Sequence, residues 1–356
     1  MLPVPTVVVA SIDPVLRESA VDGLVSDLCG AVALRVDMYV DQGLLHRTVY
    51  DTASVIEDAW VPLEHVCLSC AMREEILPTL ERIATTLRPA AIHVALPVTA
   101  EPMPLVAALR AYEPVEVRGV VSVFDADRLE SDLLGDNLLA ERGLAFTTGD
   151  RRAVGEVLAH QVEAADLLLT PEPPPARAAA LLDHLVDATV RRQPLHDTDG
   201  CDLVAPGRDP EPTADDAMRG DLLHVGSTGA APREGVWTLD LQSWRPLHPR
   251  RLLDQVVTLG TGPLRGRGHF WLPTRPTVVC AWDGAGGQLS IGDHGQWPAG
   301  PDTHLVITGT APDPDALITA FDTALMDDAE LARGLARWRG QPDGLDRWLG
   351  EQRGAA

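Results

Sequence analysis

The sequence contains no lysine in its 356 residues, so its side-chain positive charge rests on arginine. This absence excludes every mechanism that depends on a lysine side chain. Long apolar runs are also lacking, since nothing approaches the roughly 20 residues of a membrane-spanning helix. The apolar run 6–10 near the N-terminus is too short for a signal peptide and follows no basic leader. We therefore expect no membrane segment.

Cysteine is scarce as well. The cysteines are odd in number and sparse, unlike the disulfide framework of a secreted domain. They are Cys29, Cys67, Cys70, Cys201 and Cys280. A reducing cytoplasm fits this pattern best.

Acidic residues outnumber basic ones, and the formal net charge is -23. A field of this sign repels nucleic-acid phosphates and anionic lipid, which argues against direct binding to DNA or to a membrane surface. Hydrophobic residues make up 45% of the chain and charged residues 23%, the balance of a soluble globular protein. The length allows two domains, each with its own apolar core.

The first half of the chain alternates short β-branched runs with helical patterns, as in a parallel sheet covered by crossover helices. The predicted strands are 6–10, 31–36, 91–96, 117–124 and 165–170, and the predicted helices are 73–86, 104–111 and 176–186. These elements predict an α/β domain over residues 1–195.

The second half has a different pattern of predicted elements. Residues 196–234 are rich in glycine, proline and aspartate, which predicts a mobile linker. A smaller α+β domain is predicted over residues 235–328, and a loosely docked helical tail over residues 329–356. The elements of the smaller domain are strands at 236–241, 269–272, 277–282 and 304–308 and helices at 249–259 and 313–326.

This second half also carries the most specific motifs. In chain order they are Arg245-Pro-Leu-His-Pro249, Arg265-Gly-Arg-Gly-His-Phe-Trp271, Trp282 with Gly286-Gly287, Gly295-Gln-Trp297 and Leu325-Met-Asp-Asp-Ala-Glu330. Their order resembles the C-terminal domain of the CobW family. Taken singly, the same residues fit structural roles: Pro249 the first position of a helix, His248 a capping or packing group, and the aromatic side chains a core.

The first half resembles the CobW family more faintly, in the same order. Val66-Cys-Leu-Ser-Cys70, which precedes an arginine and an apolar helix, is similar to the family's Gly-Cys-x-Cys-Cys metal motif, with Ser69 at the middle cysteine. The stretch 120–126 is similar to the family's Val-Val-Asp-Ala strand, and 161–169 to its Gln-x-x-x-Ala-Asp stretch. The resemblance implies a GTPase-like parallel sheet for the first domain.

The cysteine motif predicts a zinc site. A helix N-terminus favours the thiolate form of Cys67 and Cys70, and two thiolates three residues apart can hold one soft metal ion. A closed zinc site needs about four ligands, and the candidates for the others are His65, His46 and His93. A reduced cysteine pair at a helix cap and a redox pair remain as alternatives.

The phosphate-binding loop of the family is missing. Such a loop needs glycines whose backbone N–H groups cradle the phosphates, a lysine, and a Ser or Thr hydroxyl on magnesium. The chain reads Ser11-Ile-Asp-Pro-Val-Leu-Arg-Glu18 at this place, where Asp13 and Glu18 would repel a triphosphate and Pro14 lacks a backbone donor. We expect Arg17 to be an ordinary arginine on a helix surface, with anion binding as the alternative. The domain is therefore predicted to be a degenerate GTPase domain that binds no nucleotide.

Other signatures of catalysis are missing too. The family places Asn-Lys-x-Asp after the strand that ends near Leu169 to read guanine, and this chain has Thr170-Pro-Glu-Pro-Pro there. No Gly-x-Ser-x-Gly elbow and no His-Glu-x-x-His helix supports hydrolase chemistry. We predict no catalytic residues.

Three features together point to a function: the missing phosphate loop, the Cys-x-Ser-Cys motif and the Arg-Pro-x-His-Pro domain. They resemble an actinobacterial subgroup of CobW-like proteins that recruit a ribosome hibernation factor. The resemblance implies a zinc-responsive, nucleotide-independent adaptor that brings this factor to the ribosome under zinc limitation. The alternative is a zinc metallochaperone or metal-insertion protein that delivers metal through Cys67 and Cys70. An NTPase with a rebuilt pocket is a third hypothesis.

An adaptor with this net charge would meet a basic partner protein rather than RNA. The arginines of the second half are a local exception, suited either to an acidic patch or RNA edges or to pairing at the surface. They are Arg245, Arg250, Arg251, Arg265 and Arg267.

Overall fold

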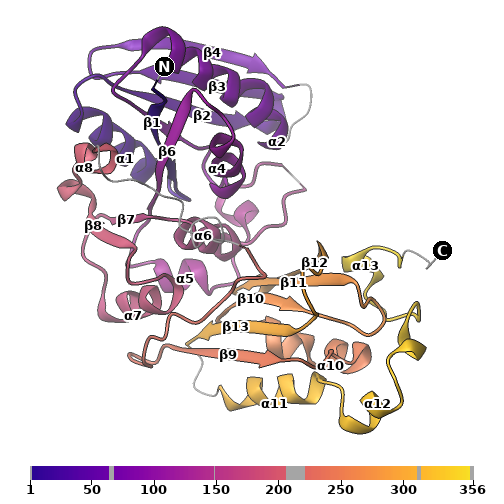
Figure 1. The fold of residues 1–356 in the computed structure, drawn as a ribbon. Helices are drawn as coiled ribbons and strands as arrows, with labels where there is room; N and C mark the ends of the chain where they lie inside the picture. Colours follow the sequence, from indigo (N-terminus) through magenta and orange to yellow (C-terminus); the bar gives the residue numbers. More distant parts are fainter. Residues whose placement is uncertain (1, 64–67, 148, 206–220, 311–313, 353–356) are drawn as a thin grey trace. The chain divides into compact units, whose positions relative to one another are not determined.

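The computed structural model describes the chain except for residues 1, 64–67, 148, 206–220, 311–313 and 353–356 (Figure 1). Contacts gather into two units. Unit 1 comprises residues 1–129, 138–175 and 188–217, and unit 2 comprises residues 130–137, 176–187 and 218–356. Two short pieces of the first half therefore belong to unit 2.

Unit 1 is built on an eight-stranded sheet in the order β4-β3-β2-β5-β1-β6-β7-β8. The strands are β1 (Val4–Ala10), β2 (Ala31–Tyr39), β3 (Leu44–Tyr50), β4 (Val55–Pro62), β5 (Ala91–Ala95), β6 (Val115–Val123), β7 (Leu167–Thr170) and β8 (Arg191–Pro194). From β2 to β8 in this order the neighbours are parallel, whereas β3 and β4 add to the edge as an antiparallel hairpin. The predicted α/β class with a parallel-rich sheet is confirmed.

Helices cover both faces of this sheet. On one side, which we name face A, buried side chains of α2 (Leu68–Ala71), α3 (Leu77–Arg82) and α4 (Met103–Arg110) pack against β1, β2 and β5. On the other side, face B, α1 (Pro14–Asp27) and α8 (Gly200–Val204) pack on Val7, Val9 and Ala95. Because side chains alternate between the two faces along a strand, the strand register assigns each strand residue to one face.

The other helical segments of unit 1 are α6 (Val154–Glu163), the π-helical turns Met72–Ile76 and Ile83–Leu87 that flank α3, and the 3-10 turns Val40–Gln42, Leu139–Arg142 and Leu195–Asp197.

The sequence predicts no strand at β3 or β4, which form a hairpin in the structure. β4 has exposed side chains along its whole length, at Val55, Ile56 and Trp60 among others. Along β4 exposed residues alternate with half-buried ones, and the apolar Ile56 and Trp60 are among the exposed residues, so the strand lacks the apolar alternation by which a half-buried strand is recognised. Its pairing therefore leaves little trace in the local pattern.

Unit 2 is built on a five-stranded antiparallel sheet in the order β12-β11-β10-β13-β9. The strands are β9 (Trp237–Ser243), β10 (Leu264–Phe270), β11 (Val278–Ala285), β12 (Gln288–Gln296) and β13 (Thr303–Gly309). On its core face, α10 (Pro249–Gly260) and α11 (Asp315–Ala324) pack on side chains that include Phe270 and Trp282, both fully buried. The short helices α12 (Asp328–Ala332) and α13 (Asp346–Leu349), with the 3-10 turn Ala336–Trp338, form the end of the chain.

The other face of this sheet, its outer face, contacts the two pieces from the first half, which contain α7 (Ala176–Leu185) and most of α5 (Leu129–Leu133). His184 of α7 contacts the Thr238 hydroxyl on β9 at 2.9 Å. At the β11–β12 turn, a Cβ on Gly286 would lie 1.8 Å from the carbonyl oxygen of Gly135, and its φ is +59°. Only glycine fits there, which accounts for Gly286 in the Gly286-Gly287 motif.

The structure corrects two strand predictions in this unit. The strand predicted at 269–272 ends at Phe270 and begins at Leu264, and β12 lies where none is predicted. In β10, Gly266 leaves space for Trp282, whose indole nitrogen would lie 3.2 Å from a Cβ at this position. The glycines and arginines of β10 interrupt the apolar alternation by which a strand is recognised. Trp282 of β11 fills the space that a side chain at position 266 would occupy.

Structural roles that the sequence indicates in this unit are confirmed. His248 caps α10, its Nδ1 accepting from the Arg251 amide at 3.4 Å, and Pro249 occupies the first turn.

Among the described residues, no helix combines the length and apolarity that a membrane span requires.

Candidate functional site

The loop between β1 and α1, where a phosphate would bind in a GTPase, holds the chain's own carboxylate. Asp13 is the N-cap of α1, and its Oδ1 accepts from the amides of Val15 and Leu16 at 2.8 and 3.0 Å. The hydroxyl of Ser11 donates to the Val123 carbonyl at 2.7 Å and accepts from the Asp13 amide at 2.9 Å. The donors that would cradle an anion at this helix N-terminus are thus satisfied internally.

Arg17, one turn into α1, is not the surface arginine that the sequence suggests. It is 3% exposed, and its Nη1 donates to the Leu96 carbonyl at 2.8 Å. Its Nη2 lies 2.7 Å from carboxylate oxygens of both Asp37 and Glu18, and Arg35 pairs with Glu18 from the other side at 2.9 Å. Both arginines therefore neutralise carboxylates of the chain rather than an incoming phosphate.

Beside this network lies a cleft of about 240 Å³, which is smaller than the roughly 300 to 1,000 Å³ of typical ligand pockets. Its lining residues come from the ends of β2 and β5, from α1 and from the 143–146 loop. They are Pro14, Asp37, Met38, Tyr39, Pro97, Val98, Gly143, Leu144, Ala145 and Phe146. The cleft supplies neither the room nor the positive charge for a nucleoside triphosphate.

Only part of the predicted zinc site can be placed. Cys67 and His65 lie outside the described residues. Cys70 lies in α2, half-buried, on the helical layer that covers face A. His46 and His93 lie on strands, and their positions decide whether they can join it.

His46 and His93 both project from face B. His46 on β3 contacts an oxygen of Asp58 at 2.6 Å and stacks on the ring of Trp60, with centroids 4.2 Å apart. His93 on β5 is fully buried, and neither ring nitrogen has a hydrogen-bond partner among the described residues. Burial lowers the pKa of His93 to about 4, because the apolar surroundings disfavour the imidazolium ion.

The structure does not bring these two histidines together. His93 is in register with Ala33, and Ala33 with Tyr50 of β3, whereas His46 lies four residues further along that strand. This separates the two backbones by about 14 Å along the strand direction alone, while zinc contacts its ligands at about 2 Å. The sheet also stands between both imidazoles and the helix that carries Cys70.

Unit 2 holds a second group of histidines, which the motif analysis does not single out. Asp221 lies 2.9 Å from His224 Nδ1 and 3.5 Å from His294 Nε2. His269 is buried, with Nδ1 2.7 Å from the Leu222 carbonyl. Partial burial raises the pKa of Asp221, but hydrogen bonds from the Leu223 amide and His224 bring it below its usual range. The spacing of these residues along the chain gives no signal, because residues 221–224, β10 and β12 come together only in the folded unit.

No arrangement of three or more His, Cys, Asp or Glu side chains suited to a metal ion occurs within the part of the chain that the structure describes. Of the predicted cysteine pair, only Cys70 is among the described residues.

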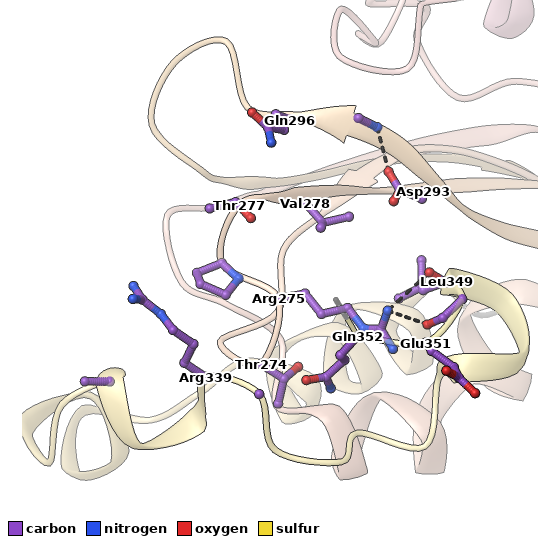
Figure 2. A pocket seen from close by; sticks show the side chains of 15 residues that line it. Thr274, Arg275, Thr277, Val278, Asp293, Gln296, Arg339, Leu349, Glu351 and Gln352 are labelled. Atoms are coloured by element: carbon purple, nitrogen blue, oxygen red, sulfur yellow. Dashed lines mark hydrogen bonds between the residues drawn. The ribbon is translucent and has the colours of Figure 1, made fainter. Parts of the chain in front are cut away.

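Figure 2 shows a larger cleft, of about 1190 Å³, between the β11–β12 sheet edge and the C-terminal helical turns of unit 2. Arg275 crosses its floor and holds the tail: its guanidinium donates to Asp343 at 2.8 Å and to the Gly350 carbonyl at 2.8 Å. None of the described lining residues is a histidine or a cysteine. The cleft therefore offers no zinc ligand of the usual nitrogen or sulfur type.

The arginines of unit 2 are largely paired within the chain. Arg245 contacts Asp328 at 2.6 Å, Arg251 contacts Glu330 at 2.8 Å, and the buried Arg265 pairs with Asp283. These three arginines form ion pairs within the chain, which favours pairing over binding to an acidic patch or to RNA.

Comparison with known proteins identifies both halves of the chain. Residues 35–192 match the CobW/HypB/UreG nucleotide-binding domain, and residues 236–325 match the cobalamin synthesis protein cobW C-terminal domain. The first match begins after α1 and so leaves out the loop capped by Asp13.

Curated relatives align along most of the chain. A zinc chaperone of Mycobacterium tuberculosis is 28% identical over 339 residues, covering 82% of this chain and 80% of its own. The zinc-regulated GTPase metalloprotein activator 1 of Dictyostelium discoideum is 22% identical over 338 residues, covering 79% of this chain and 69% of its own.

Among solved structures, the zinc-bound YjiA GTPase from E. coli aligns with 91% of this chain and 99% of its own, at 14% identity and a TM-score of 0.35. A zinc-bound triple mutant of the YjiA GTPase aligns over the same shares at 13% identity and a TM-score of 0.38. From the two domain matches, the chain contains a CobW/HypB/UreG-type nucleotide-binding domain followed by a CobW C-terminal domain.

Proposed function

We propose that this chain is a zinc metallochaperone of the CobW type that works without a nucleotide at α1. Two relatives that align with about four-fifths of the chain are named for zinc, one as a chaperone and one as a zinc-regulated activator of metalloproteins. The observation that carries the nucleotide-independent part is the Asp13 carboxylate, which takes the helix N-terminal amides that a phosphate would need.

In this proposal Cys67 and Cys70 supply the zinc ligands of the chain, as two thiolates near the start of the α2–α3 helical layer. The strand register places His46 and His93 on the face opposite Cys70, so in this proposal His65 and the client protein supply the further ligands. A zinc ion held by few ligands keeps open coordination positions. Such a site can pass its ion to a client that offers more ligands.

The finer prediction, recruitment of a ribosome hibernation factor under zinc limitation, gains no support from the relatives named above, and we adopt the metallochaperone alternative in its place. We also propose that the protein acts in the cytoplasm, because free thiolate ligands persist in a reducing compartment.

Zinc transfer tests the proposal. The purified full chain, loaded with zinc, is mixed with a chromophoric chelator that reports the rate of release, with and without GTP and magnesium. We expect about one equivalent of zinc that is lost in the Cys67→Ala, Cys70→Ala double variant, and release that is indifferent to GTP. Cys201→Ala, which changes an exposed cysteine of α8, is the matched control.

Equal zinc content in the double variant and the wild type would refute the cysteine site. Release that accelerates with GTP would instead refute the nucleotide-independent mechanism and leave the zinc site standing.

A further inference from the structure

The outer edge of the unit 1 sheet carries exposed aromatic side chains for which the proposed zinc role has no use. Trp60 of β4 is 52% exposed and Tyr39 is 40% exposed, with ring centroids 5.0 Å apart. His46 stacks on the indole from the other strand, with the two rings only 11° from parallel. An ordered aromatic surface of this kind presents large contact area at low entropic cost, as binding surfaces do.

The backbone beside these rings is open to pairing. β4 is the last strand of the sheet, and within the described residues it pairs with β3 alone. Its outward N–H and C=O groups can therefore accept an added strand. Asp58 and Trp60 both lie on face B, opposite Thr48 and His46, so an added strand would meet an acidic and an aromatic position in turn.

The charge along this row is negative. The Asp58 side chain is 60% exposed, and only the imidazole of His46 contacts it in the structure as described. Arg47 of β3 does not neutralise it, because this arginine is on face A, where it is paired with Glu57 and Glu75. A cationic side chain placed here would gain the attraction of Asp58 and of the Trp60 ring face together.

We propose that the β4 edge and its face B row form a docking site for an extended, basic segment of a partner protein. The segment adds a strand beside β4 and places an arginine or lysine against Trp60 and Asp58. A second copy of this chain is a poorer occupant, because pairing two β4 edges would bring two acidic strands together. The inference goes beyond the proposed zinc role and does not depend on bound metal.

Peptide binding to the metal-free full chain tests this site. The probe is a short end-blocked peptide that alternates valine and arginine, compared with one in which glutamate replaces arginine and with one that is N-methylated at alternate amides. We expect the arginine peptide to bind at least about tenfold more tightly than either comparison peptide. Trp60→Ala and Asp58→Asn should each weaken it by about tenfold.

The matched control is Trp244→Ala, since Trp244 is 66% exposed and belongs to unit 2. It should leave peptide affinity unchanged. Asp58→Asn preserves shape, so it keeps the test valid if Trp60→Ala proves unstable. Equal binding of the glutamate peptide, equal binding of the N-methylated peptide, or affinity unaffected by Asp58→Asn would each overturn the proposal.

Discussion

The Oδ1 atom of Asp13 lies 2.8 Å from the backbone nitrogen of Val15, in the first turn of α1. An anion belonging to the chain thus sits at the helix N-terminus, where the partial positive charge of the helix would otherwise attract a phosphate.

Wild-type protein should show no detectable binding of GTP or ATP in magnesium buffer by calorimetry. The variant Asp13→Ala frees the amides of Val15 and Leu16 but adds no lysine, so it should still bind no nucleotide. It should lose about 1 kcal/mol of unfolding free energy, the usual cost of an N-cap. A wild-type isotherm with a micromolar dissociation constant and a stoichiometry near one would contradict this prediction.

Replacing Arg17 with methionine should lower the unfolding free energy by about 1 to 3 kcal/mol, because Asp37 loses its 2.7 Å contact and keeps only Arg35 at 3.5 Å. Denaturant titration measures the loss. Arg151→Met, at an exposed position, is the control and should change stability little. Adding Asp37→Asn to Arg17→Met should recover part of the loss. No recovery would mean that the two side chains are not coupled.

His93 should make stability depend on pH. Burial holds its folded-state pKa at about 4, below the unfolded value near 6.5, so acid protonates the unfolded chain first. The stabilising contribution is therefore complete above pH ~6.5 and is lost as the pH falls toward the folded pKa, by about 2 kcal/mol at pH ~5. The variant His93→Leu should lack this part of the pH dependence. Equal slopes for wild type and variant would show that His93 titrates normally.

The zinc stoichiometry of single variants should show which candidate side chains bind the ion. His46→Ala and His93→Leu should leave the zinc stoichiometry unchanged, since both imidazoles lie on face B, away from the helical layer of Cys70. Cys70→Ala should lower it. Elemental analysis after gel filtration measures the content. A loss of zinc in His46→Ala would show that the chain rearranges around the ion.

Sequence by itself determined the chemistry of the α1 loop and the class of the fold. The sequence shows that this loop lacks the glycines and the lysine of a phosphate-binding loop, and the structure adds that Asp13 caps α1. Local sequence patterns also predict the buried strand β1 and the capping role of His248. A run of apolar residues marks a strand that is buried on both faces, and a helix cap depends on a few neighbouring residues.

Tertiary structure decided what lies far apart along the chain. Arg17 reads as a surface arginine until β2 brings Asp37 beside it. His46 and His93 read as zinc ligands until the strand register places them apart and on the face opposite Cys70. Residues 176–187, which lie within the α/β domain predicted over residues 1–195, belong to unit 2, where His184 contacts Thr238 of β9. Local periodicity reports whether a side chain is buried, whereas its partner depends on strand order and register, which are set by packing of the whole sheet.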